Sequence, residues 1–90
     1  MDKQQFDLAL QQLHHELQQI ESVDETEQQL LRQLMADIRK LTRSENSDQL
    51  RAPEGLVEEL TEGIERFEAS HPQATMLMGQ VIDALGKMGI

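Results

Sequence analysis

The sequence predicts an all-α protein in which two helical hairpins, made of four amphipathic helices, form a helical bundle. Apolar residues recur at alternating intervals of three and four along most of the chain. Polar turn signals interrupt this pattern near residue 22, over residues 43–53 and at residues 70–72. Only two of the 90 residues are aromatic, so the core must be aliphatic, which suits packing of helix against helix.

The first helix is expected to run from about Asp2 to Glu21. Its apolar residues form a heptad seam, which consists of Phe6, Leu10, Leu13, Leu17 and Ile20. Pairs of glutamine fall once per heptad on the opposite face, at residues 4–5, 11–12 and 18–19. These pairs are interpreted as a solvated face of good helix formers, and an uncharged patch for a partner is the alternative.

A capping signal, Ser22-Val-Asp-Glu-Thr-Glu27, predicts a tight turn and a second helix from about Glu25 to Arg43. The seam of this helix consists of Leu31, Leu34, Ile38 and Leu41, with Leu30 and Met35 beside it. The heptad count stays in step across the turn. One long interrupted helix is therefore the alternative to a helical hairpin over residues 2–43.

Residues 43–53 are polar and lack any period, which predicts a mobile linker between the two hairpins. Pro53 suits the first turn of a third helix, expected from about Glu54 to Ala69. The predicted seam of this helix consists of Val57, Leu60, Ile64 and Phe67, joined by Leu56. Its glutamates project mostly from the opposite face.

Pro72 separates the third helix from a fourth, expected to end at Met88, because the residue before a proline is pushed out of the α region. The short turn predicts a second hairpin over residues 54–89. The fourth helix is apolar around most of its circumference, which is typical of a core or an interface. The candidate interface residues are Leu77, Met78, Val81, Ile82, Leu85 and Met88. Gly79 and Gly86 either permit close packing against another chain or are merely tolerated.

The net charge of −9 is concentrated in residues 54–70, which contain six glutamates and one arginine. This balance argues against binding to nucleic acid or to anionic lipid, because both require a basic face. The chain has no cysteine, no signal-peptide pattern at its start and no apolar run long enough to span a membrane. We therefore expect a soluble cytoplasmic protein formed by one domain over residues 1–90.

Candidate catalytic groups are few. Of the three histidines, His14 and His15 diverge by about 100° on a helix and have no further metal ligand one turn away. His71 lies at the turn, where capping explains its neighbour Ser70. Phosphate loops and the common hydrolase motifs are absent from the sequence. The sequence thus predicts no catalytic residue, no metal site and no cofactor, and an enzyme is not expected.

Several segments resemble a family of short bacterial proteins catalogued as a domain of unknown function. The most specific are Phe67-Glu-Ala-Ser-His-Pro72 and the ending Met88-Gly-Ile90, supported by Leu13-His-His-Glu-Leu17 and by residues 31–38. The resemblance covers nearly the whole chain. It implies a bacterial and cytoplasmic source, and it assigns no catalytic or binding residue.

These observations favour a non-enzymatic interaction or scaffold protein that works through apolar helix faces as a homodimer. A bundle closed within one chain is the alternative to the dimer, because four helices of this length suffice for it. One alternative function is a small acidic regulator that binds a basic protein segment through Glu58, Glu62 and Glu65. Another is a carrier of a metal or small ligand that uses the histidines.

Overall fold

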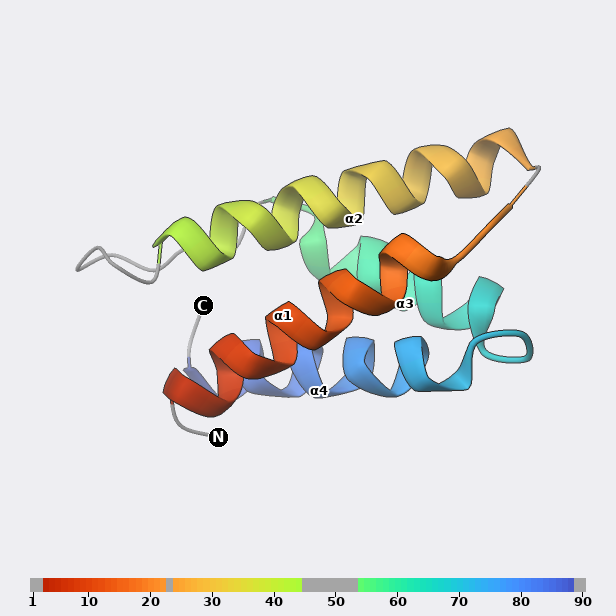
Figure 1. The fold of residues 1–90 in the computed structure, drawn as a ribbon. Helices are drawn as coiled ribbons and strands as arrows, with labels where there is room; N and C mark the ends of the chain where they lie inside the picture. Colours follow the sequence, from red (N-terminus) through yellow and green to blue (C-terminus); the bar gives the residue numbers. More distant parts are fainter. Residues whose placement is uncertain (1–2, 23, 45–53, 89–90) are drawn as a thin grey trace.

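The computed structural model describes residues 3–22, 24–44 and 54–88, and this part of the chain contains four helices and no strand. The helices are α1 (Lys3–Gln19), α2 (Glu25–Ser44), α3 (Leu56–Phe67) and α4 (Pro72–Met88). They pack as a ring in which each helix contacts the next and α4 closes back on α1 (Figure 1). The predicted all-α helical bundle is confirmed.

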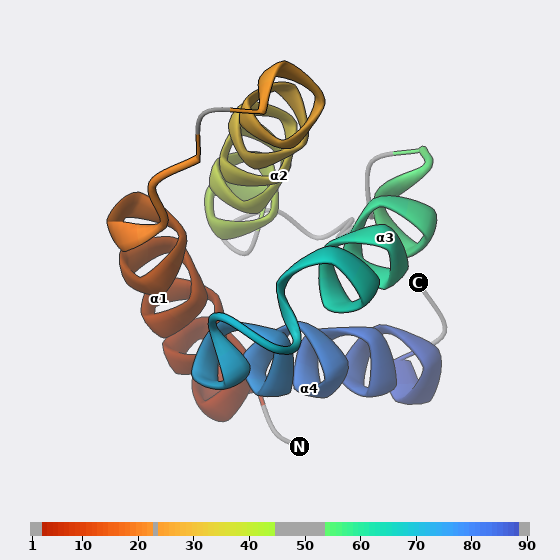
Figure 2. The same ribbon diagram turned by 90° about the vertical axis from the view of Figure 1, so that its right-hand side faces the viewer.

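The second hairpin crosses the first at an angle. In Figure 2, α2 is seen nearly end-on, whereas α4 lies across the view beneath α3 and reaches α1. The helix α4 consequently packs against α3 on one flank and against α1 on the other. Its broad apolar surface is covered in large part by its own chain.

A relay of hydrogen bonds separates α1 from α2. The carboxylate of Asp24 accepts the backbone N–H of Glu27 at 3.1 Å, which is an N-cap contact. The hydroxyl of Ser22 accepts the backbone N–H of Asp24 at 3.1 Å and donates to the carboxylate of Glu27 at 2.7 Å. The relay satisfies donors at the start of α2. Two helices therefore form here, although the unbroken heptad count had allowed one long helix as the alternative.

The remaining boundaries differ little from those expected. The helix α2 ends at Ser44, and residues 45–53 of the predicted linker lie outside the described residues. The helix α3 begins at Leu56 because Gly55 has a left-handed φ of 84°, which a helix cannot contain. The helix α4 begins at Pro72, as expected.

The predicted seams of α1 and α2 form the centre of the core. Each of these side chains is at most 8% exposed: Phe6, Leu10, Leu13, Leu17, Ile20, Leu31, Leu34, Ile38 and Leu41. In α3 the predicted seam is wrong at one position, because Val57 is 41% exposed whereas its neighbour Leu56 is 1% exposed. The helix is rotated so that Gly63 faces the core.

Gly63 allows three helices to meet at one point. A Cβ atom at this position would lie 2.9 Å from Sδ of Met78 on α4 and 3.5 Å from Cδ1 of Leu34 on α2. Both of those side chains are fully buried, so they have little room to move. By contrast, a Cβ at Gly79 would meet nothing within 4 Å.

We expect Gly63→Val to lower the free energy of unfolding by about 1–3 kcal/mol, because the added methyl groups overpack the junction of the three helices. Gly79→Ala is the control, and it should raise the free energy of unfolding by up to about 1 kcal/mol through helix propensity alone. Urea unfolding followed by circular dichroism measures both. A Gly63→Val variant as stable as the wild type would contradict the close packing described here.

Candidate functional site

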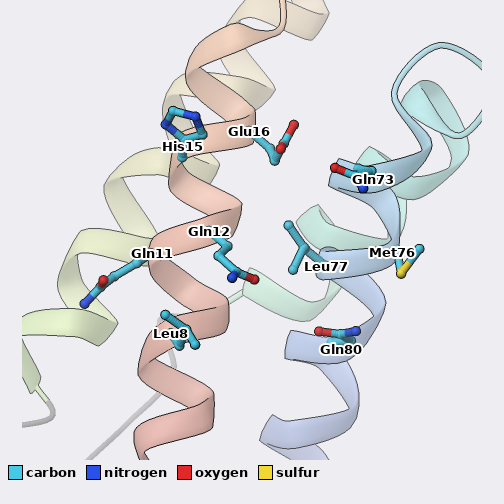
Figure 3. A pocket seen from close by; sticks show the side chains of 9 residues that line it. All are labelled: Leu8, Gln11, Gln12, His15, Glu16, Gln73, Met76, Leu77 and Gln80. Carbon is cyan, nitrogen blue, oxygen red and sulfur yellow. The ribbon is translucent and has the colours of Figure 1, made fainter.

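A groove with a volume of about 540 Å³ runs along the outer surface between α1 and α4 (Figure 3). Nine residues line it: Leu8, Gln11, Gln12, His15, Glu16, Gln73, Met76, Leu77 and Gln80. The two helices are antiparallel here, since Glu16 lies near Gln73 whereas Leu8 lies near Gln80 in Figure 3. The groove thus joins the first and last helices of the chain.

Apolar side chains lie exposed beside this groove. Leu8 is 54% exposed and Met76 is 60% exposed, and they are two of three large apolar residues that are exposed in the described part of the chain. Leu77 is half-buried and points from α4 into the space between the helices, where Gln12 points toward it from α1 (Figure 3). The surface offers apolar contact area between amide groups.

The groove is almost free of formal charge. Glu16 is the one charged residue among the nine, although charged residues make up 28% of the chain. Four of the remaining eight are glutamines, whose amides can donate and accept hydrogen bonds. Such a face is unsuited to holding an ion and is suited to contact with another protein surface.

The six predicted interface residues of α4 divide into three groups. Met78, Val81 and Leu85 are at most 1% exposed, so within one chain they pack in the core and have no surface to offer. Leu77 and Ile82 are half-buried at the edge of the core, and Leu77 lines the groove. Met88 ends α4, and its side chain lies outside the described part of the chain.

The two exposed apolar residues of the groove, Leu8 and Met76, were not among the predicted interface residues. Leu8 lies off the heptad seam of α1, and a single leucine off a seam carries little signal. Met76 is apolar on the far side of α4, which periodicity alone cannot tell from scattered surface methionine. The glutamine pair at residues 11–12 was the available clue, and both of its members line the groove.

The histidines occupy three different environments. Nε2 of His15 lies 2.8 Å from Nε2 of Gln19, one turn along α1, and Nε2 of His14 is buried without a hydrogen-bond partner. The ring of His71 lies edge-on to that of Phe67, with 6.3 Å between centroids. Among the residues that the structure describes, no three His, Asp or Glu side chains are grouped so that they could hold a metal ion.

The acidic side chains of α3 lie mostly in solvent. Glu58, Glu62 and Glu65 are exposed, as their positions opposite the seam predict. Arg66 forms ion pairs with Glu62 at 3.2 Å and, across the α2–α3 contact, with Glu27 at 3.8 Å. The arginine of α3 thereby connects this face to the start of α2.

Fold and surface together define a small four-helix domain with an uncharged, partly apolar groove. The chain belongs to the family described as a domain of unknown function (DUF4404), whose family model matches residues 7–90. The resemblance seen in the sequence is thus confirmed. Comparison with curated proteins and with solved structures found no match. In the described residues no helix is long and apolar enough to cross a membrane.

We expect zinc to leave the ring nitrogen resonances of His14, His15 and His71 unmoved. In the described residues none of these histidines belongs to a group of three side chains that could bind a metal ion together. Titration of the protein with zinc, followed by ¹H–¹⁵N spectra of the imidazoles, measures this. Saturable shifts at one equivalent of zinc would instead favour the metal carrier. Inert magnesium provides the ionic-strength control.

Proposed function

We propose that this protein is a non-enzymatic interaction module that associates with a second copy of itself through the groove between α1 and α4. The observation that carries this proposal is the coincidence of exposed Leu8 and Met76 with a nearly uncharged groove. Burial of exposed apolar surface supplies the driving force, at roughly 25 cal/mol per Å². The absence of competing charge keeps the cost of desolvation low.

Charge favours a second copy as the occupant. Each chain carries a net charge of −9, so two copies repel each other wherever their acidic faces meet. The groove, with Glu16 as its one charged residue, is a surface on which two such chains can meet with little repulsion. A basic partner would gain nothing from this surface and would be drawn to the glutamates of α3 instead.

The chemistry of the groove is also self-complementary. In a two-fold symmetric dimer the same patch contributes from both chains, so each group must be able to contact its own kind. Glutamine amides meet this condition because each one both donates and accepts hydrogen bonds. Leucine and methionine meet it as well, whereas carboxylates do not. Four glutamines with Leu8, Met76 and Leu77 therefore suit an isologous contact.

The acidic regulator is the second candidate function, and the exposure of Glu58, Glu62 and Glu65 favours it. It predicts association with a basic protein segment that weakens as salt rises, because exposed charges are screened. Self-association through the groove predicts the opposite, since apolar burial is not screened. Salt therefore discriminates between the two functions.

We expect sedimentation equilibrium to detect a dimer that persists at high salt and that dissociates about 100-fold more readily in the double variant Leu8→Glu, Met76→Glu. Each charge is introduced twice in a symmetric dimer, and a carboxylate buried without a partner costs several kcal/mol. Both side chains are more than half exposed in the single chain, so the fold should survive, as circular dichroism can verify.

Val57→Glu is the matched control. Val57 is also an exposed apolar residue, 41% exposed, but it lies on α3 and does not line the groove. Its substitution should leave the dimer intact. A wild-type chain that stays monomeric at high concentration would refute the proposed function, and equal weakening by both variants would refute the assignment to the groove.

A further inference from the structure

Two adjoining hollows lie between α1 and α2. The larger has a volume of about 630 Å³ and the smaller a volume of about 350 Å³. Arg39 of α2 lines both of them, so they are parts of one surface. We call this surface, formed by the residues that line the two hollows, the α1–α2 surface. It shares only Gln11 with the lining of the groove between α1 and α4.

One stripe of residues along α2 forms the edge of this surface. Its members alternate in spacing between four and three, which places them on one face of the helix: Gln28, Arg32, Met35, Arg39 and Thr42. Both arginines are exposed, and the half-buried Met35 lies between them. Since an α-helix rises 1.5 Å per residue, the two arginines are about 10 Å apart along the axis of α2.

The two arginines have no acidic partner in the described structure. Neither forms an ion pair or a hydrogen bond there. The sequence explains this, because no acid stands three or four residues before or after Arg32 or Arg39. By contrast, Arg66 and Lys87 each pair with an acid four residues earlier, at 3.2 Å in both cases. The chain has 17 acids and 8 bases, so position and not scarcity leaves the two arginines unpaired.

The neighbouring polar side chains of the stripe already have partners within the chain. The hydroxyl of Thr42 donates to the backbone carbonyl of Ile38 at 2.9 Å. The amide of Gln28 donates to the backbone carbonyl of Ser22 at 2.6 Å. A guanidinium group has five N–H donors in a planar fork that matches a carboxylate. The arginines are therefore the members of the stripe best suited to bind an external acid.

The charge of the α1–α2 surface is opposite in sign to that of the whole chain. Two arginines and one acid, Glu21, line it, which gives a formal charge of +1 with His14 neutral, whereas the chain carries −9. Glu21 is exposed and forms no ion pair with either arginine. Arginine and methionine are also enriched where proteins bind one another. An acidic partner with some apolar surface complements these residues.

We propose that the α1–α2 surface binds an acidic amphipathic helix of another protein. Two carboxylates of that helix, one heptad apart, pair with Arg32 and Arg39, and an apolar side chain between them contacts Met35. A single small anion fits less well, because arginines about 10 Å apart along α2 do not hold one carboxylate together. A nucleic acid is repelled by the net charge of the chain. This binding goes beyond self-association, which uses the groove between α1 and α4.

Fluorescence anisotropy with a labelled helical peptide of about 18 residues tests the proposal on the whole chain. The peptide has two glutamates one heptad apart, a leucine between them, and alanine and glutamine elsewhere. We expect it to bind, and we expect Arg32→Gln and Arg39→Gln each to weaken binding about threefold to fivefold, because each removes one exposed ion pair. Binding to the wild type should also weaken as salt rises. Both arginines are exposed, so the variants should keep the fold.

Lys87→Gln is the matched control, because it removes one positive charge from an exposed position of α4 that does not line the α1–α2 surface. It should leave the affinity unchanged. A second peptide, with glutamine in place of both glutamates, should bind at least about fivefold more weakly. The proposal is overturned if the acidic peptide does not bind, or if Lys87→Gln weakens binding as much as the arginine variants do. Equal competition by a short DNA strand would also overturn it, since the arginines would then bind any polyanion.

Discussion

The close approach of three helices at Gly63 is the constraint on which the rest of the arrangement depends. With no side chain at this position, Met78 of α4 and Leu34 of α2 both reach the backbone of α3. The helix α3 is the shortest of the four, and this junction sets its rotation about its own axis. Leu56 is consequently buried and Val57 faces outward.

Most of the fold could be predicted from the sequence because its signals are local. The cap at Asp24, the proline at residue 72 and the seams of α1 and α2 each depend on residues within one or two turns of one another. The same reasoning does not predict that Gly63 of α3 faces the core, because a heptad pattern is defined by apolar side chains and glycine has no side chain. The predicted seam therefore included both Val57 and Leu56, and only Leu56 is buried.

The groove could not be predicted, because it joins two helices whose contact is not encoded locally. Periodicity identifies the apolar face of a helix but not the helix that covers it. The broad apolar surface of α4 indicated a second chain, yet α1 and α3 cover it from both flanks, and Met78, Val81 and Leu85 are buried within one chain. The edge of α4 that faces α1 stays accessible, and there Leu77 lines the groove together with residues from the first helix of the chain.

The two contacts between the hairpins differ in chemistry, and they therefore differ in how strongly salt affects them. The α2–α3 contact contains the ion pair between Arg66 and Glu27, so salt weakens part of it. The surface at α1 and α4 is nearly uncharged, so salt has little effect on it. In the described part of the chain the backbones of α3 and α1 make no close approach, and the molecule is about 20 Å across its shorter axes. This exceeds the Debye length of about 8 Å at physiological ionic strength. In the proposed self-association, a second copy seated on the groove would therefore be largely screened from the acidic face of α3, so the high net charge of the chain would oppose such pairing only weakly.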